Sequence, residues 1–529
     1  MKNKFFGLTR LISIMTASER RRFSAEFSSG LHSKSGQLPI GLVIFQILAA
    51  MNEYDEVVFH KKLKKAIADP RQLKKVMARL PVERLYLQER LMLFLRGMNA
   101  GYYPSLQIKE LLINAKILME RGLIDLSQQA LDKAREKAIE TENSLALLEI
   151  NREQRTLMYS QVNNIKALKT ILSPLIVEKE TRFQLLKEEL YYQDLYDLAG
   201  AFADKKNGAT EHEDLMNKLR QAEPLLNQLD SLPNLSGYRL LGAFANLANA
   251  QNDPKRSSVC TQLLAQWWED HPQLIAESPF RYMLSAANAL SNLVKNKDNT
   301  GFISLRDKLK KRVAMLPHQE LAEFRFVNRL ELFWCMNNKK MDEAYQKAKE
   351  IEAGYKKYGA LLNPRMRISV VFNYGVAYFV NGKYGEALLV FNRLRRYDST
   401  GERRDVIYQA ELLGLICVFE LSVNKLTSHP DEDEHSDPLE SRFRRVNRLF
   451  KGYQLAEDSY EMTLLGFHKR IMYTGGKKRK EAIAAMKQYL LPFSDDSVKI
   501  TSGVSEHLAW LDSLLQDKSI RQIYLEKPD

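Results

Sequence analysis

Basic side chains near the N-terminus are the residues best suited to chemistry with an anionic partner. The first 100 residues contain 18 Lys and Arg against 8 Asp and Glu, so they carry +10 of the chain's formal net charge of +14. Lysine and arginine neutralise the phosphates of nucleic acids. The candidate nucleic-acid contacts are Lys61, Lys62, Lys64, Lys65, Arg71, Gln72, Lys74 and Lys75.

These eight residues flank a short break at Ala68-Asp69-Pro70. Two helices joined there can form a helix-turn-helix, with Arg71, Gln72 and Lys75 at the start of the recognition helix, where such motifs contact base edges. The break differs from the glycine-containing turn that many of these motifs use. Lysines also commonly solvate an exposed helix face. Both interpretations stay open at the level of sequence.

The segment Thr427–Pro438 gathers potential metal ligands, because it holds two histidines and five acidic residues. Their spacing matches no calcium loop, and the glycine of such a loop is missing. The pattern therefore favours a solvated acidic loop over a metal site. Four arginines follow the segment and are expected to form only surface ion pairs with its acids. They are Arg442, Arg444, Arg445 and Arg448.

Local catalytic motifs are missing from the sequence. It contains no Gly-x-Ser-x-Gly elbow, no His-Glu-x-x-His helix and no Gly-x-Gly-x-x-Gly turn. The Gly475-Gly476-Lys477 run is not a phosphate-binding loop, because its glycine spacing is wrong and neither Ser nor Thr follows the lysine. Catalytic groups can also converge from distant positions. We nevertheless expect no enzyme activity, no cofactor and no bound metal.

Cysteine spacing and hydropathy indicate the cellular compartment in which the protein functions. Cys260, Cys335 and Cys417 lie too far apart for a zinc knuckle or a disulfide framework, which favours a reducing compartment. The longest uncharged stretch is 35–52, and its apolar part, Pro39–Met51, is too short to cross about 30 Å of hydrocarbon. No signal-peptide pattern opens the chain. We expect a cytoplasmic protein without a membrane partner.

Apolar residues recur at helical spacing through almost the whole chain, whereas alternating strand patterns are scarce. For example, Ile108, Leu112, Ala115 and Met119 share one helix face. Many helix starts carry a side-chain acceptor before proline or a reciprocal capping pair. The acceptors before proline are Asp69, Asp253, Ser278, Asn363 and Asp437, and the pair is Thr16 with Glu19. The sequence predicts an all-α protein.

The clearest helical hairpin spans 370–396. Small and aromatic residues stand there at the positions that a tetratricopeptide repeat uses to bring two helices together. They are Gly375, Tyr378, Gly382, Ala387 and Phe391. The hairpin resembles one such repeat, although Val371 and Ser399 replace the tryptophan and proline of the family pattern. The resemblance implies an irregular TPR-like α-solenoid, and the helical periodicity of the sequence predicts roughly eight or nine hairpins in it.

In that family, the first helix of each hairpin faces a concave groove. The resemblance implies that the peptide-groove residues are Ser369, Phe372, Asn373, Val376, Phe379 and Val380. Most are apolar, and only Asn373 fits a carboxylate clamp, so an amphipathic helix is the expected ligand. Alternatively, a neighbouring segment of the protein covers this surface, because most apolar helical residues belong to cores.

The concentration of charge predicts two domains. A basic helical N-terminal domain is expected over 1–102, and a TPR-like repeat array over 103–529, with the acidic loop 427–438 inside it. Within the first domain, separate helices are predicted over Arg71–Leu80 and Val82–Asn99. Its opening, LTRLISIMTASERRRF, resembles uncharacterised bacterial helical proteins.

These features predict a noncatalytic intracellular scaffold or adaptor that binds a protein or peptide on a concave helical surface. The alternative is a nucleic-acid-binding regulator. It would use the basic N-terminal domain for phosphate contacts and the repeats to sense a partner.

Overall fold

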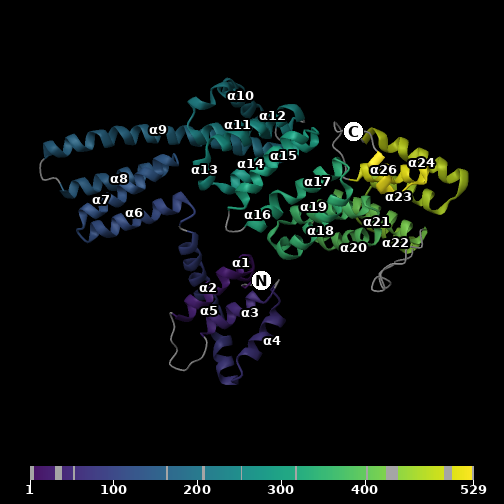
Figure 1. The fold of residues 1–529 in the computed structure, drawn as a ribbon, viewed down its shortest axis with the longest axis horizontal. Coiled ribbons are helices and arrows are strands. Elements are labelled where there is room, and N and C mark those ends of the chain that lie inside the picture. Colours follow the sequence, from purple (N-terminus) through teal and green to yellow (C-terminus); the bar gives the residue numbers. More distant parts are fainter. Residues whose placement is uncertain are drawn as a thin grey trace. The chain divides into compact units, whose positions relative to one another are not determined.

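The structure is a computed structural model, and every element that it describes is a helix (Figure 1). The all-α class predicted from the sequence is confirmed. None of the helices in the described part is both long and apolar enough to cross a membrane. The described residues are 5–29, 39–51, 54–99, 101–161, 165–204, 209–251, 253–315, 319–400, 403–423, 439–493 and 503–526.

The chain divides into two compact units. The first comprises Met1–Leu8 and Met15–Leu309, and the second comprises Thr9–Ile14 and Lys310–Asp529. The division falls within α1 (Phe6–Ile14) and α15 (Asn299–Val313). The boundary expected near residue 102 lies inside the first unit, and a separate basic domain there stays a prediction.

A small helical cluster opens the first unit. Its helices are α2 (Ala17–Ser29), α3 (Ile40–Ala49), α4 (Glu56–Ala66) and α5 (Pro70–Asn99). The ring of Phe23 lies at its centre, with its centroid 4.7 Å from that of Phe45 and 5.4 Å from that of Phe94. Thr16 and Glu19 form the predicted capping box, because each side chain accepts a hydrogen bond from the backbone N–H of the other residue.

The helix α5 is continuous, so the prediction of two helices meeting at Pro81 is wrong. Proline in a helix interior cannot donate the usual backbone hydrogen bond and normally favours a break. The helix continues because the residues on either side of it are buried: Leu80 is 9% exposed and Leu87 is fully buried. Packing of α5 on α3 thus outweighs the local preference of proline.

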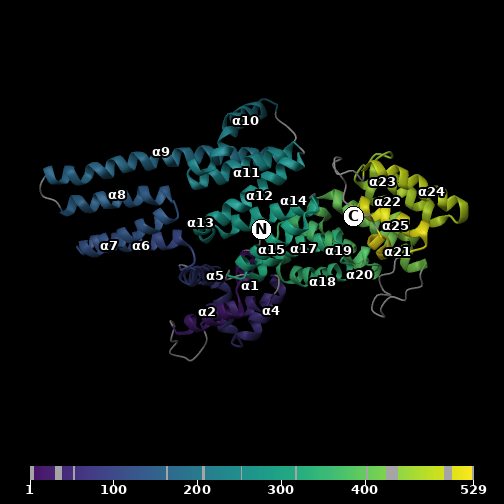
Figure 2. The same ribbon diagram turned by 45° about the horizontal axis from the view of Figure 1, so that its top comes forward.

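Four helices joined by short connections follow. They are α6 (Pro104–Glu120), α7 (Ile124–Glu140), α8 (Ser144–Gln161) and α9 (Ile165–Asp204). Leu131, Ala134, Leu147 and Ile150 belong to the core between them. The 40-residue α9 extends beyond α8 and also packs against α11 (Asn234–Ala250), as both views show (Figure 1 and Figure 2). One long helix therefore joins two helical layers of the first unit.

Further helices complete the first unit. They are α10 (Ala209–Ala222), η1 (Glu223–Ser231), α12 (Pro254–Asp270), α13 (Pro272–Glu277) and α14 (Pro279–Lys295). Asp253 caps α12 as predicted, because its side chain accepts a hydrogen bond from the backbone N–H of Arg256 at 2.9 Å. The expected cap at Ser278 is not formed by its side chain.

The second unit contains the predicted hairpin. Its helices are α16 (Gln319–Phe326), α17 (Asn328–Asn337), α18 (Met341–Tyr358), η2 (Gly359–Leu361), α19 (Pro364–Val380), α20 (Tyr384–Leu394), η3 (Arg395–Thr400), α21 (Arg404–Val423), α22 (Leu439–Gly452), α23 (Tyr460–Tyr473), α24 (Gly476–Leu490), η5 (Leu491–Phe493), α25 (Val504–Gln516) and α26 (Ile520–Glu526). Between α19 and α20, Gly375 is required because a Cβ there would lie 2.9 Å from atoms of Val390 and Phe391. Gly382 forms the turn with φ +72°.

Candidate functional site

The predicted groove residues on α19 form part of the protein's own core. Phe372 and Val376 are 6% and 5% exposed, and Phe379 and Val380 are fully buried. The reason is that α19 contacts helices on several sides, namely α17, α18, α20, α21 and α26. The sequence left open whether this surface is available or covered. These four side chains are covered by neighbouring helices of the same chain.

The two polar members of the predicted groove, Ser369 and Asn373, are half-buried. The hydroxyl of Ser369 donates to the carbonyl of Arg365 at 3.1 Å and accepts from the guanidinium of Arg403 at 3.2 Å. The hydrogen-bonding capacity of Ser369 is therefore largely used within the protein. The six predicted residues lie together on α19, but they offer little side-chain surface to a peptide.

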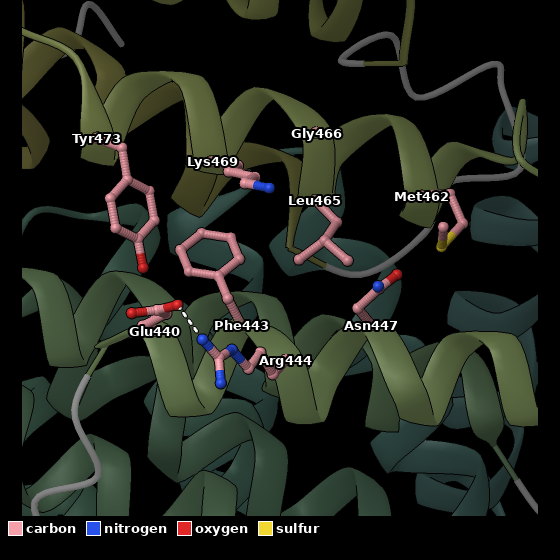
Figure 3. Close-up of a pocket in the computed structure, with 9 residues that line it drawn as sticks. All are labelled: Glu440, Phe443, Arg444, Asn447, Met462, Leu465, Gly466, Lys469 and Tyr473. Atoms are coloured by element: carbon pink, nitrogen blue, oxygen red, sulfur yellow. Dashed lines mark hydrogen bonds and ion pairs between the residues drawn. The ribbon is translucent and has the colours of Figure 1, made fainter.

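A surface pocket with a volume of about 390 Å³ lies between α22 and α23 (Figure 3). Helix α22 contributes Glu440, Phe443, Arg444 and Asn447, and α23 contributes Met462, Leu465, Gly466, Lys469 and Tyr473. These residues recur every three or four positions, which places each set on one face of its helix. The volume falls in the range of typical ligand pockets, roughly 300–1,000 Å³.

The floor of the pocket is apolar, and a glycine is among its lining residues. Phe443 and Leu465 are 7% and 6% exposed, and the ring of Phe443 packs against that of Tyr473 with centroids 5.5 Å apart. A Cβ built at Gly466 would meet no heavy atom of the described chain within 4 Å. Gly466 is one of the residues that line the pocket, so the lining has no side chain at this position of α23 (Figure 3).

The polar groups that line the pocket are two cations, one carboxylate and two neutral groups. Glu440 and Arg444 form an ion pair one helical turn apart on α22 (Figure 3). Lys469 and Asn447 line the pocket and form no hydrogen bond or ion pair with other described residues. Burial and the nearby Glu440 carboxylate raise the pKa of Tyr473, so its hydroxyl stays protonated at neutral pH. The pocket thus combines an apolar floor with polar groups that pair with no described residue.

Arg442 anchors α22 to the rest of the second unit. Its guanidinium donates to the side-chain oxygen of Asn392 at 2.8 Å and pairs with Glu411 at 3.4 Å. Arg395 pairs with the same carboxylate. Burial lowers the pKa of Arg442 to about 10 and Glu411 opposes this shift, so the group stays charged at neutral pH. The expectation of a surface ion pair is wrong for Arg442, because Gly414 leaves room for a buried guanidinium.

Helix α23 also carries a buried histidine, outside the pocket lining. The rings of His468 and His507 of α25 stack with centroids 5.1 Å apart, and both residues are fully buried. Burial lowers the pKa of His507 to about 4, and it lowers the pKa of His468 well below its usual value. Neither ring nitrogen of His468 has a hydrogen-bond partner within the described chain. The two rings are therefore neutral parts of the core behind the pocket.

The candidate nucleic-acid residues lie where α4 ends and α5 begins, and both helices pack on α3. Lys62 and Gln72 are half-buried, whereas Lys61, Lys64, Lys65, Arg71, Lys74 and Lys75 are exposed. The ammonium of Lys62 donates to the carbonyl of Ala50 at 3.3 Å, so it helps to hold the end of α3. The six exposed cations form no ion pair with any described residue. They remain available to an anion.

Other polar candidates add no site to the described chain. The acidic segment Thr427–Pro438 lies outside the described residues. Within the ranges given above, no three His, Cys, Asp or Glu side chains are placed to hold a metal ion. Cys260, Cys335 and Cys417 are buried free thiols, and burial raises the pKa of each. A raised pKa disfavours the reactive thiolate.

The pocket between α22 and α23 was not predicted from the sequence. One signal is present, because Phe443 and Asn447, like Leu465 and Lys469, are four residues apart and therefore share a helix face. The opening at Gly466 depends on how two helices pack, and no local pattern contains that information. Apolar residues at such spacing are more typical of a core stripe than of a pocket.

Comparison with known proteins assigns no family to this chain, and the resemblance of 370–396 to a tetratricopeptide repeat stays a prediction. No protein-family model matches the chain, and neither does any curated protein or solved structure. The function of the chain is therefore inferred from the geometry of the pocket.

Proposed function

We propose that this chain is a noncatalytic helical-repeat scaffold and that its pocket between α22 and α23 receives an apolar side chain from an acidic amphipathic helix. One observation carries the proposal. Phe443 and Leu465 form an apolar floor in the same pocket in which Lys469 and Asn447 have no protein partner. We propose this pocket as the binding site, and not the predicted surface of α19, because neighbouring helices cover that surface.

The floor favours an apolar anchor. Burying one Leu or Phe side chain contributes about 1.5–3 kcal/mol relative to leaving it in water. In helix-in-groove recognition, a few such anchors from one helix face provide most of the affinity. A partner helix lying between α22 and α23 can place one anchor above Phe443, in the space left by Gly466.

The rim favours an acidic ligand. Lys469 lines the pocket, and Arg448, the residue that follows Asn447 on α22, is exposed. Glu440 is the one acidic lining residue, and its charge is already matched by Arg444. A carboxylate on the ligand can therefore pair with Lys469 without meeting an unmatched negative charge. Complementary charge of this kind contributes mainly to specificity and association rate.

Binding of designed peptides to the full chain tests this proposal. Two labelled amphipathic helices would share the same Leu and Phe face, one with glutamate and the other with lysine at every polar position. We expect fluorescence anisotropy to show tighter binding of the glutamate peptide, and Lys469→Glu to weaken it. Lys477→Glu is the matched control, because Lys477 lies on α24 and does not line the pocket. Equal affinity for the two peptides, together with an affinity that Lys469→Glu leaves unchanged, would contradict the proposal.

A second candidate function rests on the exposed cations of α4 and α5. Six of them lack an acidic partner in the described chain, which favours contact with phosphates. Replacing Lys61, Lys62, Lys64 and Lys65 with Gln should then flatten the dependence of nucleic-acid affinity on salt concentration, because fewer counterions are released on binding. No binding of DNA or RNA by the full chain at low salt would exclude this function.

A further inference from the structure

The helix α9 carries a large apolar surface that faces solvent. Ile176, Phe183 and Leu190 are 42%, 57% and 53% exposed, and Val177 and Tyr191 beside them are 66% and 41% exposed. The helices that pack most extensively against α9 are α8, α10 and α11. The described chain leaves between 41% and 66% of each of these five residues exposed. Contiguous exposed apolar side chains of this kind mark an interaction surface.

The spacing of this surface matches a helical partner. Ile176, Phe183 and Leu190 recur every seven residues, as in the seam between two packed helices. The surface is also long, because the segment from Ile176 to Tyr191 rises by about 22 Å at 1.5 Å per residue. A second helix lying along α9 would bury this stripe.

The distribution of charge along α9 indicates which helix fits. Residues 165–183 contain four basic and two acidic residues, whereas residues 184–204 contain one basic and five acidic residues. A second copy of α9 in antiparallel orientation places the basic half of each helix beside the acidic half of the other. A parallel copy would place like charges together. Antiparallel self-association therefore satisfies both the apolar stripe and the charges.

We infer that two copies of this chain associate through antiparallel α9 helices. A two-fold axis passing between Phe183 and Gln184 sets the register, since an isologous interface pairs each residue reciprocally with its counterpart. It places Ile176 opposite Tyr191 of the second copy and Val177 opposite Leu190 of the second copy.

The same register also brings Glu180 opposite Lys187 of the second copy, twice per dimer. Glu180 is 66% exposed on its side chain, and its ion-pair partner is the neighbouring Lys179 on the same surface. Lys187 is exposed and forms no ion pair within the described chain. Both groups are therefore accessible to a partner. This inference is independent of the proposed peptide pocket, because α9 belongs to the first unit and the pocket to the second.

Sedimentation velocity of the full chain over a range of concentrations tests the inference. We expect a reversible dimer, and we expect Phe183→Glu to raise its dissociation constant by about tenfold or more, because a buried charge then replaces an anchor. Ile113→Glu is the matched control: Ile113 on α6 is 57% exposed, as Phe183 is, and α6 packs on α7 and α8. It should leave the dissociation constant unchanged. Circular dichroism confirms that each variant is folded.

A charge exchange tests the register. Glu180→Lys and Lys187→Glu should each weaken the dimer by bringing like charges together, and the double variant should restore it. A chain that stays monomeric at every concentration would overturn the inference. So would a dimer that Phe183→Glu leaves intact. Failure of the double variant to restore affinity would overturn the antiparallel register.

Discussion

The guanidinium of Arg442 lies against the backbone of Gly414, in the space where any other residue would place its Cβ. Arg442 is 1% exposed and is held by Glu411 and Asn392, so its side chain cannot swing aside into solvent. A glycine on α21 thus makes room for a buried charge on α22. Because α22 forms one wall of the pocket, this contact fixes the position of that wall.

Replacing that glycine should destabilise the second unit. We expect Gly414→Ala to cost about 1–3 kcal/mol, the usual range for overpacking a core, although alanine itself favours a helix. Hydrogen exchange of the α21 amides measures this cost. Gly466→Ala is the control, because no described heavy atom lies within 4 Å of its new Cβ, and we expect it to be neutral or slightly stabilising. Equal loss of protection in both variants would show that the Arg442 contact is unimportant.

The two charges of the buried pair should respond unequally to removal. Arg442→Met leaves Glu411 paired with Arg395, whereas Glu411→Gln leaves Arg442 buried without a counter-charge. An uncompensated buried charge costs about 3–5 kcal/mol. We therefore expect Glu411→Gln to destabilise the second unit more than Arg442→Met does, as measured by hydrogen exchange of α21 and α22. The reverse order would mean that Arg442 has an alternative route to solvent.

The stacked histidines should make the second unit sensitive to acid. In the unfolded chain a histidine binds a proton near pH 6.5, whereas burial lowers the pKa of His507 in the folded protein to about 4 and that of His468 well below its usual value. The unfolded state then binds more protons, so stability is full above about pH 6.5 and falls as the pH drops below it. Each histidine contributes up to about 1.4 kcal/mol per pH unit.

A phenylalanine at position 468 isolates this effect. It keeps the stacking on His507 and Trp510 but cannot bind a proton. We expect thermal unfolding between pH 7.5 and pH 5.5 to shift less in His468→Phe than in the unmodified chain. His60→Phe on α4 is the control and should keep the full shift. An identical pH dependence in His468→Phe would rule out a contribution from this ring.

Local signals were sufficient to predict the all-α class and several helix starts. The capping box of Thr16 with Glu19 and the cap at Asp253 involve atoms within three residues of each other, so their spacing is visible in the sequence. The approach of α19 and α20 at Gly375 could also be predicted, because its contacts with Val390 and Phe391 lie within one hairpin whose residue pattern is visible in the sequence. The continuity of α5 through Pro81 could not be predicted from local sequence, because it depends on the burial of residues on both sides of the proline.

The candidate site depended on contacts that the sequence does not display. Phe379 has the spacing of a groove residue, yet helices on several sides of α19 bury it. Arg442 looks like one of several surface arginines until Gly414 and Glu411, about 30 residues earlier, are placed beside it. Local periodicity in the sequence carries no information about long-range packing of this kind.

Filling the pocket gives the most direct test of its role. We expect Gly466→Leu to fold normally, because its Cβ meets no described heavy atom within 4 Å and leucine is favoured over glycine in a helix by up to about 1 kcal/mol. Its side chain should occupy the space above Phe443 and weaken binding of the glutamate peptide by about tenfold or more, since the ligand loses its anchor site. Gly97→Leu makes the same change on α5, where the Cβ also meets nothing within 4 Å, and should leave the affinity unchanged. Because the two variants differ only in position, weaker binding confined to Gly466→Leu assigns the peptide to the α22–α23 pocket, whereas unchanged affinity in both would place it elsewhere on the chain.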